Sequence, residues 1–154
     1  MHYTLSIEIG LSIADVVKLY DNPDNWAKWQ QGFVKYESVV GQAGKTGSET
    51  ILTHMIAGKP TQMTEKVELN NLPTQMICIY QSKATLMGAW NRVDSQFIAL
   101  DKNRTCWQFA CEFRFGSLLK LMALFAPNMF RKTSLKEMNN FKQFAEKVQA
   151  EKEQ

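Results

Sequence analysis

Hydrophobic and polar residues alternate along much of the chain, and this period-two pattern predicts β-strands. In the first run, Tyr3–Ile9, the residues Tyr3, Leu5 and Ile7 fall on one face and polar residues on the other. Six further runs are strand-like: Phe33–Val40, Glu49–Ile56, Gln62–Leu69, Gln75–Ser82, Ala89–Leu100 and Thr105–Phe115. The connections are short and contain Gly, Pro, Asn or Asp, which indicates an antiparallel meander.

Two short helices are expected between the first two strands. Ser12 can cap the first helix, over Ala14–Leu19, because its hydroxyl can accept a hydrogen bond from a free N–H of the first turn. Asp24 can cap the second in the same way. That helix holds Trp26 and Trp29, which are three positions apart and therefore share a face.

The last part of the chain has a different period. From Ser117 to about Val148 the apolar residues recur at helical spacing, which predicts one long helix that Pro127 kinks or shortens by splitting off its first turns. Glu137 falls within the apolar arc of this helix, so its carboxylate faces either an interior cavity or the water at a rim. The order of elements predicts a single α+β domain over residues 1–154.

Short motifs mark these elements. They are Trp26-x-x-Trp29, Gly47-x-x-Thr50, Glu65-Lys66-Val67 ahead of the Pro73 turn, Gly88-x-Trp90-Asn91, and Asn140-Phe141-Lys142 in the last helix. With these motifs the chain resembles the START-like superfamily, also called SRPBCC, which includes the polyketide cyclase/dehydrase and lipid-transport group. The resemblance implies a helix-grip fold. In that fold a curved antiparallel sheet wraps around a long C-terminal helix, and two short helices follow the first strand.

The composition fits what this resemblance implies. Four Trp, four Tyr, nine Phe and eight Met are many for 154 residues. In the superfamily, the sheet and the long helix enclose an apolar cavity for lipid-, sterol- or polyketide-like molecules, and the aromatic and Met side chains would line it. The alternative is that the same side chains fill a solid core.

Charge and cysteine usage exclude several classes of function. The 18 basic and 15 acidic residues are interspersed, so no nucleic-acid partner is expected. Two His and three scattered Cys form no metal-binding pattern, and neither a metal nor a cofactor is expected. The odd Cys count and the absence of a secretory signal favour a cytoplasmic protein. The longest apolar stretch, 118–127, is broken by Lys120 and is too short to span a bilayer.

Strand alternation assigns candidate ligand contacts to the inner face of the sheet. For two strands, Glu49–Ile56 and Gln75–Ser82, the pattern does not decide which face points inward, because both faces carry apolar residues. The candidate ligand-binding residues are Glu65, Asn91, Tyr80, His54, Phe109, Phe113, Trp107, Met122, Phe125 and Met129. The polar members of this set would orient the polar end of a ligand, since buried polar groups need hydrogen-bonding partners.

Three functions remain open at this point. The pattern favours a protein that binds or transports an apolar small molecule. A cyclase/dehydratase-type enzyme would use His54 or Glu65 as acid or base, with Tyr80 or Asn91 holding a developing enolate. The third possibility is a co-chaperone-like interaction module. The apolar start of the last helix, 118–125, is expected to form part of the cavity mouth or to touch a membrane surface transiently.

Overall fold

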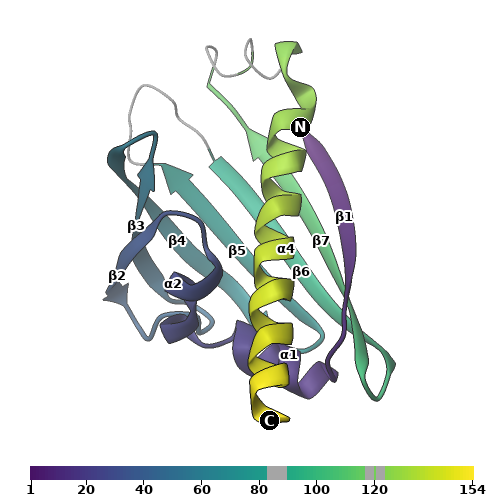
Figure 1. The fold of residues 1–154 in the computed structure, drawn as a ribbon. Helices are drawn as coiled ribbons and strands as arrows, with labels where there is room; N and C mark the ends of the chain where they lie inside the picture. The colour runs from purple at the N-terminus through teal and green to yellow at the C-terminus, as the bar shows by residue number, and fades with distance from the viewer. Residues whose placement is uncertain (83–89, 117–119, 121–123) are drawn as a thin grey trace.

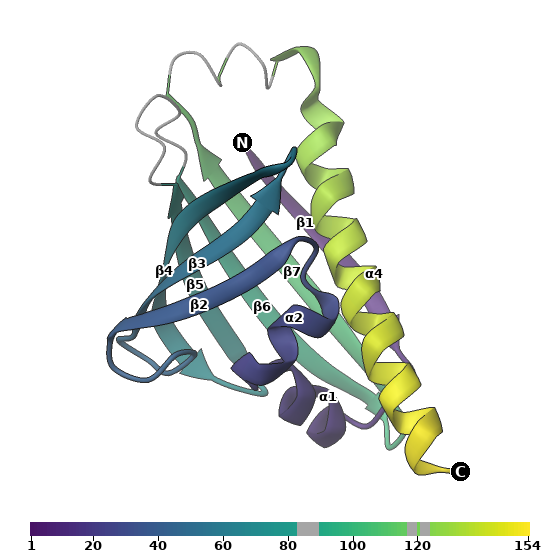
Figure 2. The same cartoon turned by 60° about the vertical axis from the view of Figure 1, so that its left-hand side comes forward.

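The structure is a computed structural model that describes residues 1–82, 90–116, 120 and 124–154. Within these residues a seven-stranded antiparallel sheet has the strand order β1-β7-β6-β5-β4-β3-β2. The strands are β1 (His2–Ile9), β2 (Phe33–Val40), β3 (Glu49–Ile56), β4 (Lys59–Asn71), β5 (Gln75–Ser82), β6 (Trp90–Asp101) and β7 (Arg104–Arg114). The sheet curves around the long helix α4 (Pro127–Lys152), as Figure 1 and Figure 2 show. The predicted α+β helix-grip architecture is confirmed.

The strands that the alternation predicted are all present, with β4 extended at both ends. The sequence pattern placed a turn at Gly58-Lys59-Pro60, whereas the pairing of Ile56 with Lys59 leaves only Ala57 and Gly58 in the turn. Both residues have positive φ, of 49° and 75°, as a two-residue hairpin turn requires. Lys59 and Pro60 therefore already belong to the strand.

The first helix, α1 (Ile13–Tyr20), begins where the sequence predicted. The Ser12 hydroxyl accepts a hydrogen bond from the N–H of Asp15 at 3.2 Å, which satisfies one of the free donors of the first turn.

We expect the Ser12→Ala substitution to lower the free energy of unfolding by about 1 kcal/mol, because it leaves that donor without its cap. Urea unfolding followed by circular dichroism would measure the change. Ser38→Ala, on exposed strand β2, is the control and should change stability by less than about 0.5 kcal/mol. Equal stability of the two variants would contradict a capping role for Ser12.

The second helical segment has a different cap from the one expected. The side chain of Asn22, and not Asp24, accepts a hydrogen bond from the N–H of Asp24 at 3.0 Å. It opens the short 3-10 helix η1 (Pro23–Asn25), which leads directly into α2 (Trp26–Trp29). Because Pro23 has no N–H to cap and favours the first helical position, the segment starts two residues earlier than the pattern suggested.

Helix α4 begins at Pro127, so Pro127 does not kink it; residues 124 and 125 are helical and Ala126 is not, which agrees with the alternative that the proline splits off the turns ahead of it. Proline suits the first turn, where its missing N–H would have no partner. Of the predicted stretch ahead of it, residues 117–119 and 121–123 lie outside the described residues. In the part of the chain that the structure describes, no helix has the length and apolar character needed to cross a bilayer.

An aromatic cluster joins α4 to the sheet and to α1 and α2. Phe141 is fully buried and meets Tyr20, Trp29 and Trp107 edge to face, with ring centroids 5.5, 5.3 and 5.6 Å apart. Ser95 accepts a hydrogen bond from the indole N–H of Trp107 at 3.1 Å. This cluster fixes α4 across the lower half of the sheet.

The structure also settles the inward faces of the two ambiguous strands. Leu52 and His54 of β3 face the space between sheet and helix, as does Tyr80 of β5. Met76 and Cys78 of β5 are buried on the same side as Tyr80.

Candidate ligand cavity

A cavity of about 670 Å³ lies between the inner face of the sheet and the first half of α4. Its wall is largely apolar or aromatic, and a few polar side chains interrupt it. The lining residues are Tyr20, Trp29, Gln30, Gln31, Leu52, His54, Met55, Ile56, Ala57, Met63, Tyr80, Val93, Trp107, Phe109, Thr133, Ser134, Lys136, Glu137 and Met138. Buried lining residues such as Leu52, Trp107 and Met138 form the deep part.

The cavity opens between the β3–β4 hairpin and α4. Met55, Ile56 and Ala57 on the hairpin, and Thr133 and Lys136 on the helix, line the cavity and are exposed to water. An exposed lining residue marks the place where the cavity meets solvent, so a ligand would enter between these two elements.

Gly32 positions the chain that borders this opening. Its φ of 73° is left-handed, and a Cβ there would lie 2.5 Å from the carbonyl oxygen of Met55. The Gly32 carbonyl accepts the Met55 N–H at 2.7 Å. Only glycine allows this close approach, which holds Gln30 and Gln31 against the end of β3.

His54 is a half-buried imidazole in the cavity wall. Its Nε2 lies 3.1 Å from the side-chain oxygen of Gln30, and an amide oxygen only accepts, so Nε2 is the protonated nitrogen. Burial lowers the pKa of His54, which keeps the ring neutral near pH 7. The remaining nitrogen, Nδ1, is then an acceptor, and it is buried without a hydrogen-bonding partner.

Glu137 closes part of the rim from the α4 side. Its carboxylate accepts the backbone N–H of Gln31 at 3.1 Å and also lines the cavity. Burial raises the pKa of Glu137 above its ordinary value. The sequence predicted that this carboxylate faces either the cavity or the water at its rim. The side chain lies at the rim, but its carboxylate binds the α2–β2 connection instead of reaching into water.

Tyr80 and Glu65 form a buried polar pair behind the cavity. They are directly opposite each other on β5 and β4, and both side chains are directed to the inner side of the sheet. Tyr80 lines the large cavity, whereas Glu65 lines a separate space of about 30 Å³. Burial raises the pKa of Glu65 to about 7, an effect that a hydrogen bond with the Tyr80 hydroxyl opposes. One carboxyl oxygen of Glu65 has no partner.

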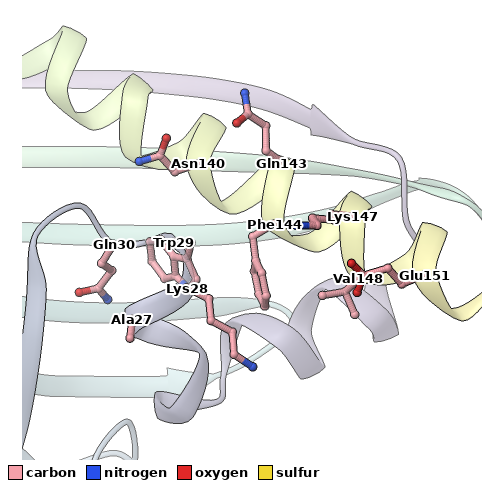
Figure 3. Close-up of a pocket in the computed structure, with 10 residues that line it drawn as sticks. All are labelled: Ala27, Lys28, Trp29, Gln30, Asn140, Gln143, Phe144, Lys147, Val148 and Glu151. Carbon is pink, nitrogen blue, oxygen red and sulfur yellow. The ribbon is translucent and has the colours of Figure 1, made fainter.

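A second hollow of equal volume, about 670 Å³, lies on the outside of the fold between α2 and the last half of α4. Figure 3 shows that charged and amide side chains from both helices border it. Among them, the Lys28 ammonium lies 5.9 Å from the centroid of the Phe144 ring. Its lining is too polar for an apolar ligand, so the inner cavity is the better candidate site.

The sequence comparison identifies a family. The family model described as polyketide cyclase / dehydrase and lipid transport matches residues 1–146. The chain belongs to this family. The comparison with curated proteins gave no match.

Solved structures of the START-like superfamily share the fold of this family member. An aromatase/cyclase from Streptomyces sp. is 14% identical, with 95% of this chain and 93% of that chain covered and a TM-score of 0.73. Norcoclaurine synthase from Thalictrum flavum, in complex with dopamine and hydroxybenzaldehyde, is 14% identical over 96% and 87%, with a TM-score of 0.71. A START superfamily protein from Mycobacterium smegmatis is 12% identical over 96% and 98%, with a TM-score of 0.72.

In this cyclase/dehydrase and lipid-transport family member, four of the ten candidate residues line the large cavity. They are His54, Tyr80, Trp107 and Phe109. Glu65 lies behind Tyr80, as described above. Met122 lies outside the described residues.

Four other candidates do not line the cavity. Asn91 is inward, but its amide contacts the Cys111 sulfur at 3.9 Å instead of the cavity space. Phe113 packs on the Phe130 ring, with centroids 5.0 Å apart, and this contact fills the upper end of the interior. Phe125 and Met129 are exposed, because the chain before Pro127 and the first turn of α4 project beyond the sheet.

Several cavity residues have no strong signal in the sequence. Tyr20 ends α1, and Gln30 and Gln31 lie in a connection, where no period assigns a direction to the side chain. Met63 and Met138 do follow the strand and helix periods, and that pattern could have included them. The sequence pattern places Trp29 on a helix face shared with Trp26 but does not show that it lines the cavity with its indole N–H buried and without a partner.

Proposed function

We propose that this protein binds, and releases or carries, an apolar small molecule in the cavity between the sheet and α4. The observation that supports this proposal is the cavity itself, whose wall is mainly aliphatic and aromatic. Its volume of about 670 Å³ is in the range of small-molecule sites, about 300–1,000 Å³. The alternative to a cavity was a solid core of aromatic and Met side chains. Such a core occupies only the lower half of the fold, where Phe141 fills the interior.

The ligand class follows from the few polar groups in the wall. Trp29 and His54 line the cavity, and the Trp29 indole N–H (a donor) and His54 Nδ1 (an acceptor) are buried without partners, so a small turn of either ring would present the group to a ligand. A buried polar group without a partner costs several kcal/mol, on the order of 2–7, which a ligand that satisfies it would recover. An apolar body with a hydroxyl or phenol group can satisfy either of them, because a hydroxyl both accepts and donates hydrogen bonds. Sterol- and polyketide-like molecules are of this kind.

Filling the cavity should abolish binding without unfolding the protein. Met63→Trp places a larger side chain in the cavity, and we expect it to weaken the binding of the fluorescent probe anilinonaphthalene sulfonate by roughly tenfold or more, the size of effect that steric exclusion from a pocket produces. Fluorescence titration measures the affinity. Gln62→Trp is the matched control, because the adjacent residue of the same strand is exposed on the outer face.

Competition with a fatty acid, a sterol and a polyphenol would then identify the ligand class, and native mass spectrometry would detect a ligand that co-purifies. The binding proposal is wrong if Met63→Trp and Gln62→Trp bind the probe equally well. It is also wrong if none of the three competitors displaces the probe.

The second candidate function is catalysis of a cyclase/dehydratase type in the same cavity. A specific observation favours it: His54 lines the cavity, burial lowers its pKa, and its Nδ1 has no partner, so a turn of the ring would let this nitrogen accept a proton from a bound substrate. Tyr80 can donate a hydrogen bond to an oxygen that becomes negative. If this reaction occurs, His54→Ala should stop turnover of a polyketide-like carbonyl compound while probe affinity changes less than about threefold. Turnover that survives in His54→Ala excludes His54 as the base.

A further inference from the structure

Exposed apolar side chains gather at two places at one end of the molecule, and one of these places borders the cavity opening. Just before α4 and in its first turn, Leu124, Phe125 and Met129 are 76%, 84% and 45% exposed. At the tip of the β3–β4 hairpin, Met55 and Ile56 are each about half exposed. We call these five residues the apolar rim. Figure 1 and Figure 2 both place the hairpin tip and the start of α4 at the same end of the molecule.

The apolar rim is unusual in its position more than in its area. Single exposed apolar residues are common on protein surfaces. Leu124 and Phe125, however, are adjacent and each has more than three quarters of its surface in water. Two of the rim residues, Met55 and Ile56, also line the opening of the apolar cavity. An apolar patch at this place marks a contact surface.

The charge around the rim identifies what it contacts. From residue 113 to residue 136 the sequence has no Asp or Glu, but it has five basic residues: Arg114, Lys120, Arg131, Lys132 and Lys136. Arg131 and Lys132 are exposed one turn after the rim residue Met129. Neither is in an ion pair with any residue that the structure describes.

We propose that the apolar rim docks on an anionic lipid bilayer. In this arrangement the rim side chains enter the interface between headgroups and acyl chains, and Arg131 and Lys132 lie against lipid phosphates. A fluid bilayer admits two separate protrusions, whereas a protein partner would need a surface shaped to fit both. Residues 113–136 carry no carboxylate that an anionic surface would repel, and the carboxylate of the next residue, Glu137, is half-buried and accepts the Gln31 N–H.

Docking would also place the cavity opening against the acyl region. A hydrophobic molecule could then pass between bilayer and cavity without crossing water. This consequence rests on the proposed ligand-binding function, but the docking itself does not, since it requires only the rim and the cations.

Vesicle co-sedimentation of the whole protein tests the proposal. The two probes are vesicles of phosphatidylcholine alone and of phosphatidylcholine with about one third phosphatidylglycerol. We expect at least tenfold tighter binding to the anionic vesicles, and loss of most of this preference when salt rises from about 0.1 M to about 1 M, because the screening length falls from about 10 Å to about 3 Å. Phe125→Asp should reduce binding at least tenfold, and Arg131→Gln with Lys132→Gln should remove the preference for anionic lipid.

Leu124→Asp and Leu100→Asp form the matched control pair. Leu100 is also exposed, at 45%, but it is next to the last residue of β6, at the end of the sheet away from the apolar rim. Its substitution should therefore leave vesicle binding unchanged. Melting temperatures of all variants would show that each is folded. The proposal is overturned if folded Leu124→Asp and Phe125→Asp bind anionic vesicles like the parent protein. It is also overturned if the parent binds no vesicles, or if it forms a dimer that Phe125→Asp dissociates, since a second copy would then be the occupant of the rim.

Discussion

Phe141→Ala should be the most destabilising single substitution among those considered for this fold. Phe141 has no exposed surface, and its ring packs edge to face on Tyr20, Trp29 and Trp107, which come from α1, α2 and β7. Its removal leaves a cavity between four elements that cannot all collapse into it. We expect a loss of about 3–5 kcal/mol in the free energy of unfolding, as for other buried Phe residues.

Thermal and urea unfolding would measure this loss, and the melting temperature should fall by roughly 10 °C for a chain of this size. Phe125→Ala is the matched control. It makes the same chemical change at a side chain that is 84% exposed, and should shift stability by less than about 0.5 kcal/mol. If the two substitutions cost the same, the aromatic cluster around Phe141 does not hold α4 to the sheet.

Glu65→Gln should make the protein more stable above neutral pH and remove a pH dependence. Glu65 is buried, and burial raises its pKa in the folded state from the ordinary value of 4.5 to about 7. Between these two values the folded state binds a proton that the unfolded state releases. The contribution of Glu65 to stability is therefore fully present below about pH 4.5 and is lost as pH rises to about 7, by an amount on the order of 3 kcal/mol.

The neutral amide cannot ionise, so the difference between Glu65→Gln and the parent protein should grow over that pH interval and stay constant above it. Urea unfolding at about pH 4.5, 6 and 8 would measure this difference. The comparison with the parent protein is needed because His54 also titrates. As pH falls, the lowered pKa of His54 reduces stability, whereas the raised pKa of Glu65 increases it. Glu68→Gln, at an exposed position of the same strand, should keep the pH dependence of the parent. A parallel curve for Glu65→Gln would show that Glu65 ionises freely in the fold.

The strands and the inward faces of β4, β6 and β7 could be predicted, because a period of two depends only on local sequence. How strands align with one another could not. Glu65 pairs with Tyr80, and Tyr80 with Asn91, so three candidate residues from three strands lie in one row across the sheet. Alternation predicted that Glu65 and Asn91 face inward, but not that they would be neighbours of Tyr80.

The cavity wall shows the same limit of sequence reasoning. Phe125 and Met129 follow the helical period that the sequence shows from Ser117 onward, yet the helix α4 starts at Pro127 and this end of it projects past the sheet. Gln30 and Trp29, in contrast, reach the cavity because the α2–β2 connection packs against His54 and Glu137. Both outcomes depend on where elements end and on what they pack against, which periodicity does not describe.

The pairing of the first and last strands has a consequence for how the chain folds. β1 hydrogen-bonds to β7, with His2 opposite Glu112, so two segments about 110 residues apart must meet before the sheet is complete. At a synthesis rate of roughly 5–20 residues per second, β1 waits about ten seconds on the ribosome for its partner. Helix α4 emerges later still. Until then the aromatic inner face of the sheet has no cover, and non-local contacts of this kind form slowly. The nascent chain is therefore a natural client for chaperones, and the protein is most exposed to aggregation just before its last helix is made.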